Sequence, residues 1–125
     1  MRLLLDFLVV GFGGFFGSMA RYGTAYLISK TTHGDFPFGT FIVNISGCLL
    51  IGLLFGLGNR MAWLEGNGWL FMVSGFCGGF TTFSTFALDN SALMGKQLSM
   101  QAMIYTVLSV VLGIVLCRLG IWLTR

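Results

Sequence analysis

The segment Gly75–Phe86, with the sequence GFCGGFTTFSTF, decides how this chain is interpreted. It combines three glycines, four hydroxyl residues and four phenylalanines within a long apolar run. A glycine inside a helix costs about 1 kcal/mol relative to alanine, and threonine also has a low helix propensity. The composition therefore predicts that a helix unwinds here, from about Gly78 to Thr82.

The surrounding chain has the composition of a membrane protein. Of its 125 residues, 56% are hydrophobic and 9% are charged, whereas a soluble domain has about 25% charged residues. Its partner is expected to be the lipid bilayer. The seven Lys and Arg residues are scattered singly, which does not match the basic patch of a nucleic-acid-binding protein. The chain is expected not to be an enzyme.

Four apolar runs are each close to, or longer than, the roughly 20 residues that span a bilayer. The first run resembles a secretory signal, with Ser18-Met19-Ala20 as a cleavage site, but Asp6 and several glycines interrupt it and three further runs follow. We therefore expect an all-α membrane protein in which residues 1–125 form a single four-helix transmembrane domain. The spans are Leu3–Ile28, Phe36–Leu57, Trp69–Leu93 and Leu98–Leu123.

The loops between these runs are short, which predicts antiparallel neighbouring helices. With four spans both termini lie on one side, where Arg2, Arg60 and Arg125 face Lys30 and Lys96 on the other side. Such a small bias in positive charge does little to fix the orientation of the chain in the membrane. We therefore expect an antiparallel, dual-topology homodimer.

Two polar residues lie within the apolar runs. Arg21 either anchors the end of the first span at the interface or draws anions into a vestibule. Asn44, near the middle of the second span, either forms a structural hydrogen bond between helices or contacts a passing ion.

All four acidic residues lie near segment ends or in loops. This disfavours the main alternative, a small proton-coupled multidrug exporter of four helices, which needs a titratable group at mid-membrane.

The other deep polar groups are neutral, namely Ser84, Thr85, Tyr105 and Ser109. Hydroxyl groups donate hydrogen bonds without holding a fixed charge, which suits an anion that must lose its water and then leave. Phe80, Phe83 and Phe86 recur at every third position. Such a stripe is usually packing, although the edges of aromatic rings also attract anions.

The cysteines are expected to be structural, whereas the unwound segment is expected to bind a cation. Cys48, Cys77 and Cys117 are odd in number and far apart, which favours small buried residues over a disulfide framework or a metal site. In the unwound segment, freed backbone carbonyls are natural ligands for a hard cation such as Na⁺.

GFCGGFTTFSTF, followed by Asp89, resembles the signature of the Fluc (CrcB) family of fluoride channels. GGFFGSMARY at 13–22 and GTFIVNISG at 39–47 resemble two further motifs of that family, in the same order. The resemblance implies two fluoride pores in an antiparallel homodimer. It also implies a central structural Na⁺ bound by the backbone carbonyls of Gly78 and Thr81.

By motif position, the resemblance also assigns the remaining site residues. Arg21 falls at the vestibule, and Gly113 falls where a further hydroxyl is possible. The implied function is passive export of cytoplasmic fluoride across the inner membrane of a prokaryote. A non-transporting membrane assembly factor is a further alternative. The implied pore residues are Asn44, Phe83, Ser84, Thr85, Phe86, Tyr105 and Ser109.

Overall fold

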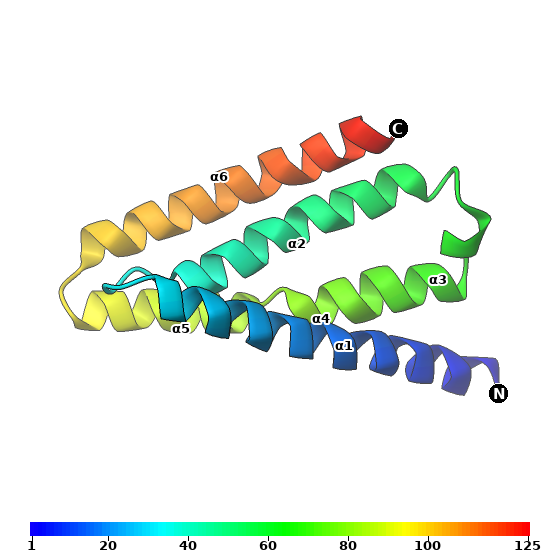
Figure 1. Cartoon of the computed structure of the whole chain (residues 1–125), viewed down its shortest axis with the longest axis horizontal. Helices are drawn as coiled ribbons and strands as arrows, with labels where there is room; N and C mark the ends of the chain where they lie inside the picture. Colours follow the sequence, from blue (N-terminus) through cyan, green and yellow to red (C-terminus); the bar gives the residue numbers. More distant parts are fainter.

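A computed structural model describes all residues from Met1 to Arg125. It contains helices and no strands, and four helical segments are long and apolar enough to cross a membrane, as the sequence predicts. Figure 1 shows these segments lying lengthwise along the molecule, with both termini at the same end.

The helix bounds lie within a few residues of the predicted spans. The first two spans are α1 (Arg2–Thr31) and α2 (Phe38–Leu57), and the last is α6 (Ser99–Thr124). A short 3₁₀ helix, η1 (Ala62–Leu64), lies in the loop before the third span. The third span consists of four pieces in succession: α3 (Asn67–Trp69), the π-helix η2 (Leu70–Cys77), α4 (Gly78–Phe80) and α5 (Phe83–Gly95).

The non-helical part of the third span is shorter than predicted. Only Thr81 and Thr82 are extended, with φ/ψ of −84°/154° and −149°/123°. The expectation that unwinding begins at Gly78 is wrong, because Gly78–Phe80 is helical. A reason is visible at Gly79, where a Cβ would lie 2.5 Å from the Gly14 carbonyl oxygen of α1. Backbone packing at that contact offsets the low helix propensity of glycine.

Glycines bring the helices together in two pairs. In the first pair, α1 packs against η2 and α4, where a Cβ at Gly75 would lie 2.8 Å from the Gly13 Cα. In the second pair, α2 packs against α6, where a Cβ at Gly120 would lie 2.6 Å from the Leu49 carbonyl oxygen. Close approach through small residues is typical of helix packing in membranes, where the hydrophobic effect does not drive helices together.

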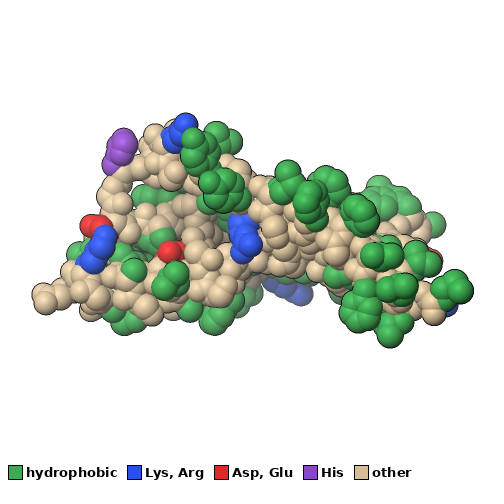
Figure 2. All heavy atoms as spheres, turned by 90° about the horizontal axis from the view of Figure 1, so that it is seen from below, with side chains coloured by type: hydrophobic (Ala, Val, Ile, Leu, Met, Phe, Trp, Pro, Cys, Tyr) green, Lys and Arg blue, Asp and Glu red, His purple; other side chains and the backbone are tan.

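The outer surface is largely apolar. Only 16 of the 125 residues are buried, and the exposed side chains include large hydrophobic residues along all four spans. Figure 2 shows hydrophobic side chains spread over one face, with a hollow toward the end that carries the single histidine, His33. An apolar surface with few charges suits lipid as the surrounding solvent.

Candidate functional site

Asn44 of α2 hydrogen-bonds the non-helical backbone between α4 and α5. Its amide nitrogen donates to the Thr82 carbonyl at 2.9 Å, and its amide oxygen accepts from the Thr82 backbone N–H at 2.8 Å. Both polar groups of one non-helical residue are therefore satisfied by a single side chain, as a backbone buried among helices requires. The sequence left two alternatives for Asn44, a structural hydrogen bond between helical segments or contact with a passing ion. The structure contains the hydrogen bond. One N–H of the amide is left for another acceptor.

Carbonyls before and at the interruption lose their usual helical partners, and those of Gly78 and Thr81 are among them. In a continuous helix the Thr82 N–H would bond to the Gly78 carbonyl, but here it bonds to Asn44. The Thr85 N–H would bond to the Thr81 carbonyl, but it bonds to the Thr82 hydroxyl instead. The carbonyls of Gly78 and Thr81, which the family resemblance implies as cation ligands, are thus without these helical partners.

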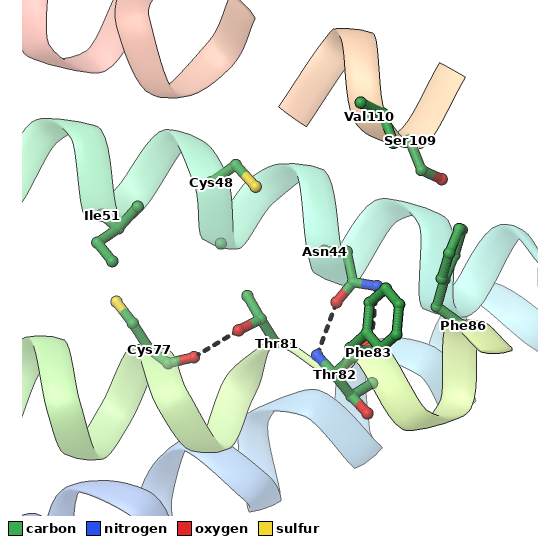
Figure 3. A pocket seen from close by; sticks show the side chains of 11 residues that line it. Asn44, Cys48, Ile51, Cys77, Thr81, Thr82, Phe83, Phe86, Ser109 and Val110 are labelled. Atoms are coloured by element: carbon green, nitrogen blue, oxygen red, sulfur yellow. Dashed lines mark hydrogen bonds between the residues drawn. The ribbon is translucent and has the colours of Figure 1, made fainter. Parts of the chain in front are cut away.

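A cavity of about 360 Å³ opens beside the interruption (Figure 3). It brings together five of the predicted site residues, namely Asn44, Thr81, Phe83, Phe86 and Ser109. Its walls come from α2, η2, the interruption, α5 and α6. The remaining lining residues are Gly47, Cys48, Ile51, Cys77, Thr82 and Val110.

The two phenylalanines of α5 differ in exposure. The Phe83 side chain is 78% exposed, whereas Phe86 is half-buried against Tyr105. Their ring centroids lie 5.6 Å apart at an interplanar angle of 41°. Phe80 does not continue this pair, because it lies before the interruption and stacks on Phe76. The stripe of three that the sequence suggests is therefore a pair.

The hydroxyl groups at the start of α5 converge on Thr82, the N-cap of that helix. Its side-chain oxygen lies 3.1 Å from the Ser84 hydroxyl and 3.3 Å from the Thr85 hydroxyl. Thr82 is not among the site residues predicted from the sequence. Threonine is among the residues preferred at a helix N-cap, and its place just before the restarted helix is the signal that would have identified it.

A second cavity, of about 290 Å³, lies on the other side of Thr82. Arg21, Thr85 and Thr82 line it, together with Ser18, Tyr22, Ala25, Thr40 and Val43. The only ion pair in the chain joins Lys96 to Asp35, so the Arg21 guanidinium has no carboxylate partner. A cationic group without a counter-charge beside hydroxyl donors can attract a small anion.

Tyr105 lies in neither of these two cavities. Its side chain is fully buried among aromatic rings, and its hydroxyl donates to the Asp89 carboxylate at 3.2 Å. One residue further along each helix, the Thr106 hydroxyl donates to the Asn90 amide oxygen at 3.0 Å. These two hydrogen bonds join α5 to α6 and so hold Phe86 beside Tyr105. A direct role for Tyr105 in ion contact stays a prediction.

Ser109 and Ser84 complete the predicted set. The Ser109 hydroxyl is buried, lines the larger cavity and has no hydrogen-bond partner within the chain. Ser84 is exposed and bonded only to Thr82. No carboxylate lines either cavity. The space between the helices therefore presents neutral donors and one unpaired arginine.

These features define a four-helix membrane protein with a mostly apolar, carboxylate-free cavity, lined by a few neutral polar side chains, beside an interruption of its third span. The family model described as CrcB-like protein, Camphor Resistance (CrcB), matches residues 8–121. The chain belongs to the CrcB family.

Several bacterial relatives that match nearly the full length of the chain are named fluoride-specific ion channel FluC. The relative from Phocaeicola vulgatus is 42% identical over 123 residues, which is 98% of both chains. The relative from Chlorobium phaeobacteroides is 39% identical over all of this chain and 96% of its own. The relative from Azobacteroides pseudotrichonymphae is 38% identical over 98% of both chains.

Proposed function

We propose that this protein is a passive, fluoride-selective ion channel. The observation that carries the proposal is the carboxylate-free cavity lined by Asn44, Phe83, Phe86 and Ser109, in a chain whose relatives are named fluoride-specific channels. A small anion moving through this space meets neutral donors and ring edges.

Fluoride holds its water tightly, and a bare ion in a low-dielectric medium costs on the order of tens of kcal/mol. The pathway must replace that water with other donors. Ser109 has a hydroxyl with no partner in the chain, and Asn44 retains a free N–H. Ring edges of Phe83 and Phe86 add a weaker attraction without a formal charge. Neutral donors would stabilise the ion without trapping it, and we propose that the pathway in the assembled dimer is too narrow for the larger chloride ion.

Two copies of the chain in antiparallel orientation would complete the pathway. The Phe83 side chain is 78% exposed beside the cavity, on a face that a second copy would cover. The nearly balanced positive charges on the two sides of the membrane support both orientations. A twofold axis through such a dimer repeats the site, so we expect two pores per dimer.

A structural Na⁺ fits the carbonyls at the interruption. The carbonyls of Gly78 and Thr81 lack the N–H partners that a continuous helix would provide. The two copies together would present four such oxygens, which are ligands suited to a hard cation. When bound, the ion would offset the carbonyl dipoles and stabilise the dimer.

The direction of transport follows from the membrane potential. An inside-negative potential is worth about 2.3 kcal/mol per charge per 100 mV, which would hold internal fluoride roughly 50-fold below the external concentration. No carboxylate lines the two cavities beside Thr82, which does not favour the proton-coupled exporter. We therefore propose export of fluoride across the inner membrane of a prokaryote.

The proposal is tested by reconstituting the purified protein in liposomes loaded with fluoride and recording efflux with a fluoride electrode. We expect rapid efflux of fluoride and none of chloride when a K⁺ ionophore balances the charge. Chloride efflux at a similar rate would exclude a fluoride-selective channel. Substrate uptake driven by a proton gradient would instead support the exporter.

A further inference from the structure

The three cysteines lie in different surroundings. Cys48 is half-buried and lines the larger cavity, and Cys77 lines it with only 3% of its surface exposed. Cys117 is also half-buried but does not line this cavity. The sequence predicts all three as small buried residues. In the structure only Cys77 is buried, and Cys48 is the one cysteine that is both half-buried and part of the cavity wall.

Cys48 follows Asn44 by one turn of α2, and Figure 3 shows both side chains beside the cavity. Four residues of helix correspond to an axial rise of about 6 Å. On the facing helix, Ser109 lines the same cavity. The next residue of α2 in the wall is Ile51, which is apolar. Cys48 is therefore the last polar side chain of α2 on this wall before it becomes apolar.

Gly113 of α6 makes room for the Cys48 side chain. A Cβ at Gly113 would lie 3.3 Å from the Cys48 Sγ, which is closer than ordinary contact. Gly113 lies one turn beyond Ser109. A hydroxyl side chain at 113 would therefore compete with the Cys48 thiol for one space.

We infer that Cys48 is a further pathway-lining residue, and that the Cys48–Gly113 pair sets the width of the pathway beyond Asn44 and Ser109. The inference rests on the proposed function. A thiol is neutral and a weak hydrogen-bond donor, so it continues the lining of neutral donors without adding a charge. The Cys48 thiol is also the one group on the α2 wall that a small, water-soluble thiol-modifying reagent can modify.

The modification is a thiol–disulfide exchange with 2-aminoethyl methanethiosulfonate. The Cys48 thiol loses its proton to water, and the thiolate attacks the sulfenyl sulfur of the reagent. An S–S bond forms to the aminoethylthio group, while the S–S bond of the reagent breaks and methanesulfinate leaves. Dithiothreitol reverses the modification by reducing the new disulfide. The added group would occupy the cavity that the thiol lines.

The first experiment applies this reagent to the full chain in liposomes and follows fluoride efflux and the modified cysteines. We expect an adduct on Cys48, seen by mass spectrometry, and a loss of flux of about tenfold or more that dithiothreitol restores, the scale of 1.4 kcal/mol in a barrier. The fluoride flux of Cys48→Ser, whatever its level before treatment, is expected to be unchanged by the reagent. Cys117→Ser should be inhibited like the unmodified sequence.

Two outcomes would overturn the inference: no adduct on Cys48, or a complete adduct with unchanged flux. The mass measurement does not depend on transport. If the protein conducts no fluoride before the reagent is added, the proposed function fails, while the adduct still reports whether Cys48 faces water.

The second experiment tests the width of the pathway without a reagent. Gly113→Ala adds a methyl group against the Cys48 thiol and is expected to lower flux about fivefold, the scale of one overpacked contact. Cys48→Ala combined with Gly113→Ala should recover most of that loss. Gly11→Ala serves as the matched control, because a Cβ at Gly11 meets nothing within 4 Å. A double variant no faster than Gly113→Ala alone would refute the pairing.

Discussion

The Asn44 side chain exchanges two hydrogen bonds with the backbone of Thr82, 38 residues away in the sequence. One amide thereby satisfies both the N–H and the carbonyl of an extended residue that lies outside the two helices. The same contact draws the Thr82 N–H away from the Gly78 carbonyl and leaves that oxygen free. The cation site and the anion pathway that we propose thus share one structural support.

Replacing Asn44 with leucine should disrupt both the proposed cation site and the proposed anion pathway. Leucine has the same number and branching of side-chain heavy atoms but leaves the two Thr82 groups without partners, at about 1–3 kcal/mol for each buried group. We expect fluoride flux to fall by about tenfold or more. Amide exchange in a peptide covering residues 78–86 should also become faster, as measured by mass spectrometry. Unchanged exchange in that peptide would show that Asn44 does not hold the interruption.

Phe83→Ile tests the aromatic contribution. The substitution keeps an apolar side chain at this exposed position but removes the ring edge that would attract an anion. We expect fluoride efflux from liposomes to fall by about fivefold or more, which corresponds to roughly 1 kcal/mol in the barrier. Leu88→Ile, at a similarly exposed position of α5, is the control. Flux equal to that of the control would return Phe83 to a purely structural role.

Removal of Na⁺ tests the cation site separately from the pathway. If the free carbonyls of Gly78 and Thr81 bind Na⁺ at a dimer interface, protein prepared in N-methylglucamine salts should dissociate or unfold at a lower temperature than protein in Na⁺. A ligand at 100 times its Kd stabilises the folded state by about 2.7 kcal/mol. Thermal unfolding and size-exclusion chromatography in the two salts measure the difference. Identical unfolding curves would argue against the site.

The glycine contact between α1 and η2 should tolerate no side chain. A Cβ at Gly17 would fall on the Phe76 carbonyl oxygen, so Gly17→Ala forces the helices apart at a cost of about 1–3 kcal/mol. Gly23→Ala on the same helix is the matched control, because its Cβ meets nothing within 4 Å. Unfolding in detergent should distinguish the two variants. Equal stability would contradict the close packing.

The sequence alone predicts the four spans, their bounds to within a few residues, and a weak point in the third span. These features depend on local composition and on the thickness of the bilayer, both of which act along the chain. The sequence also identifies Asn44, Phe83, Phe86 and Ser109, which share one cavity.

The exact place of the weak point was not predictable from local propensity. Gly78 and Gly79 have poor helix propensity, but contact between Gly79 and Gly14 keeps their backbone helical. The chain becomes extended only at Thr81 and Thr82, where Asn44 replaces the lost helical partners. A propensity scale describes one residue in isolation, whereas this interruption depends on contacts with two other helices.

The composition of the chain thus determined that it spans a membrane four times and that its third span is weak. The tertiary structure decided which backbone groups that weakness releases. It also decided that Cys48 lines the cavity and that the Tyr105 hydroxyl bonds to Asp89. The physical reason is that a buried polar group needs a partner, and in the membrane that partner comes from a distant part of the chain.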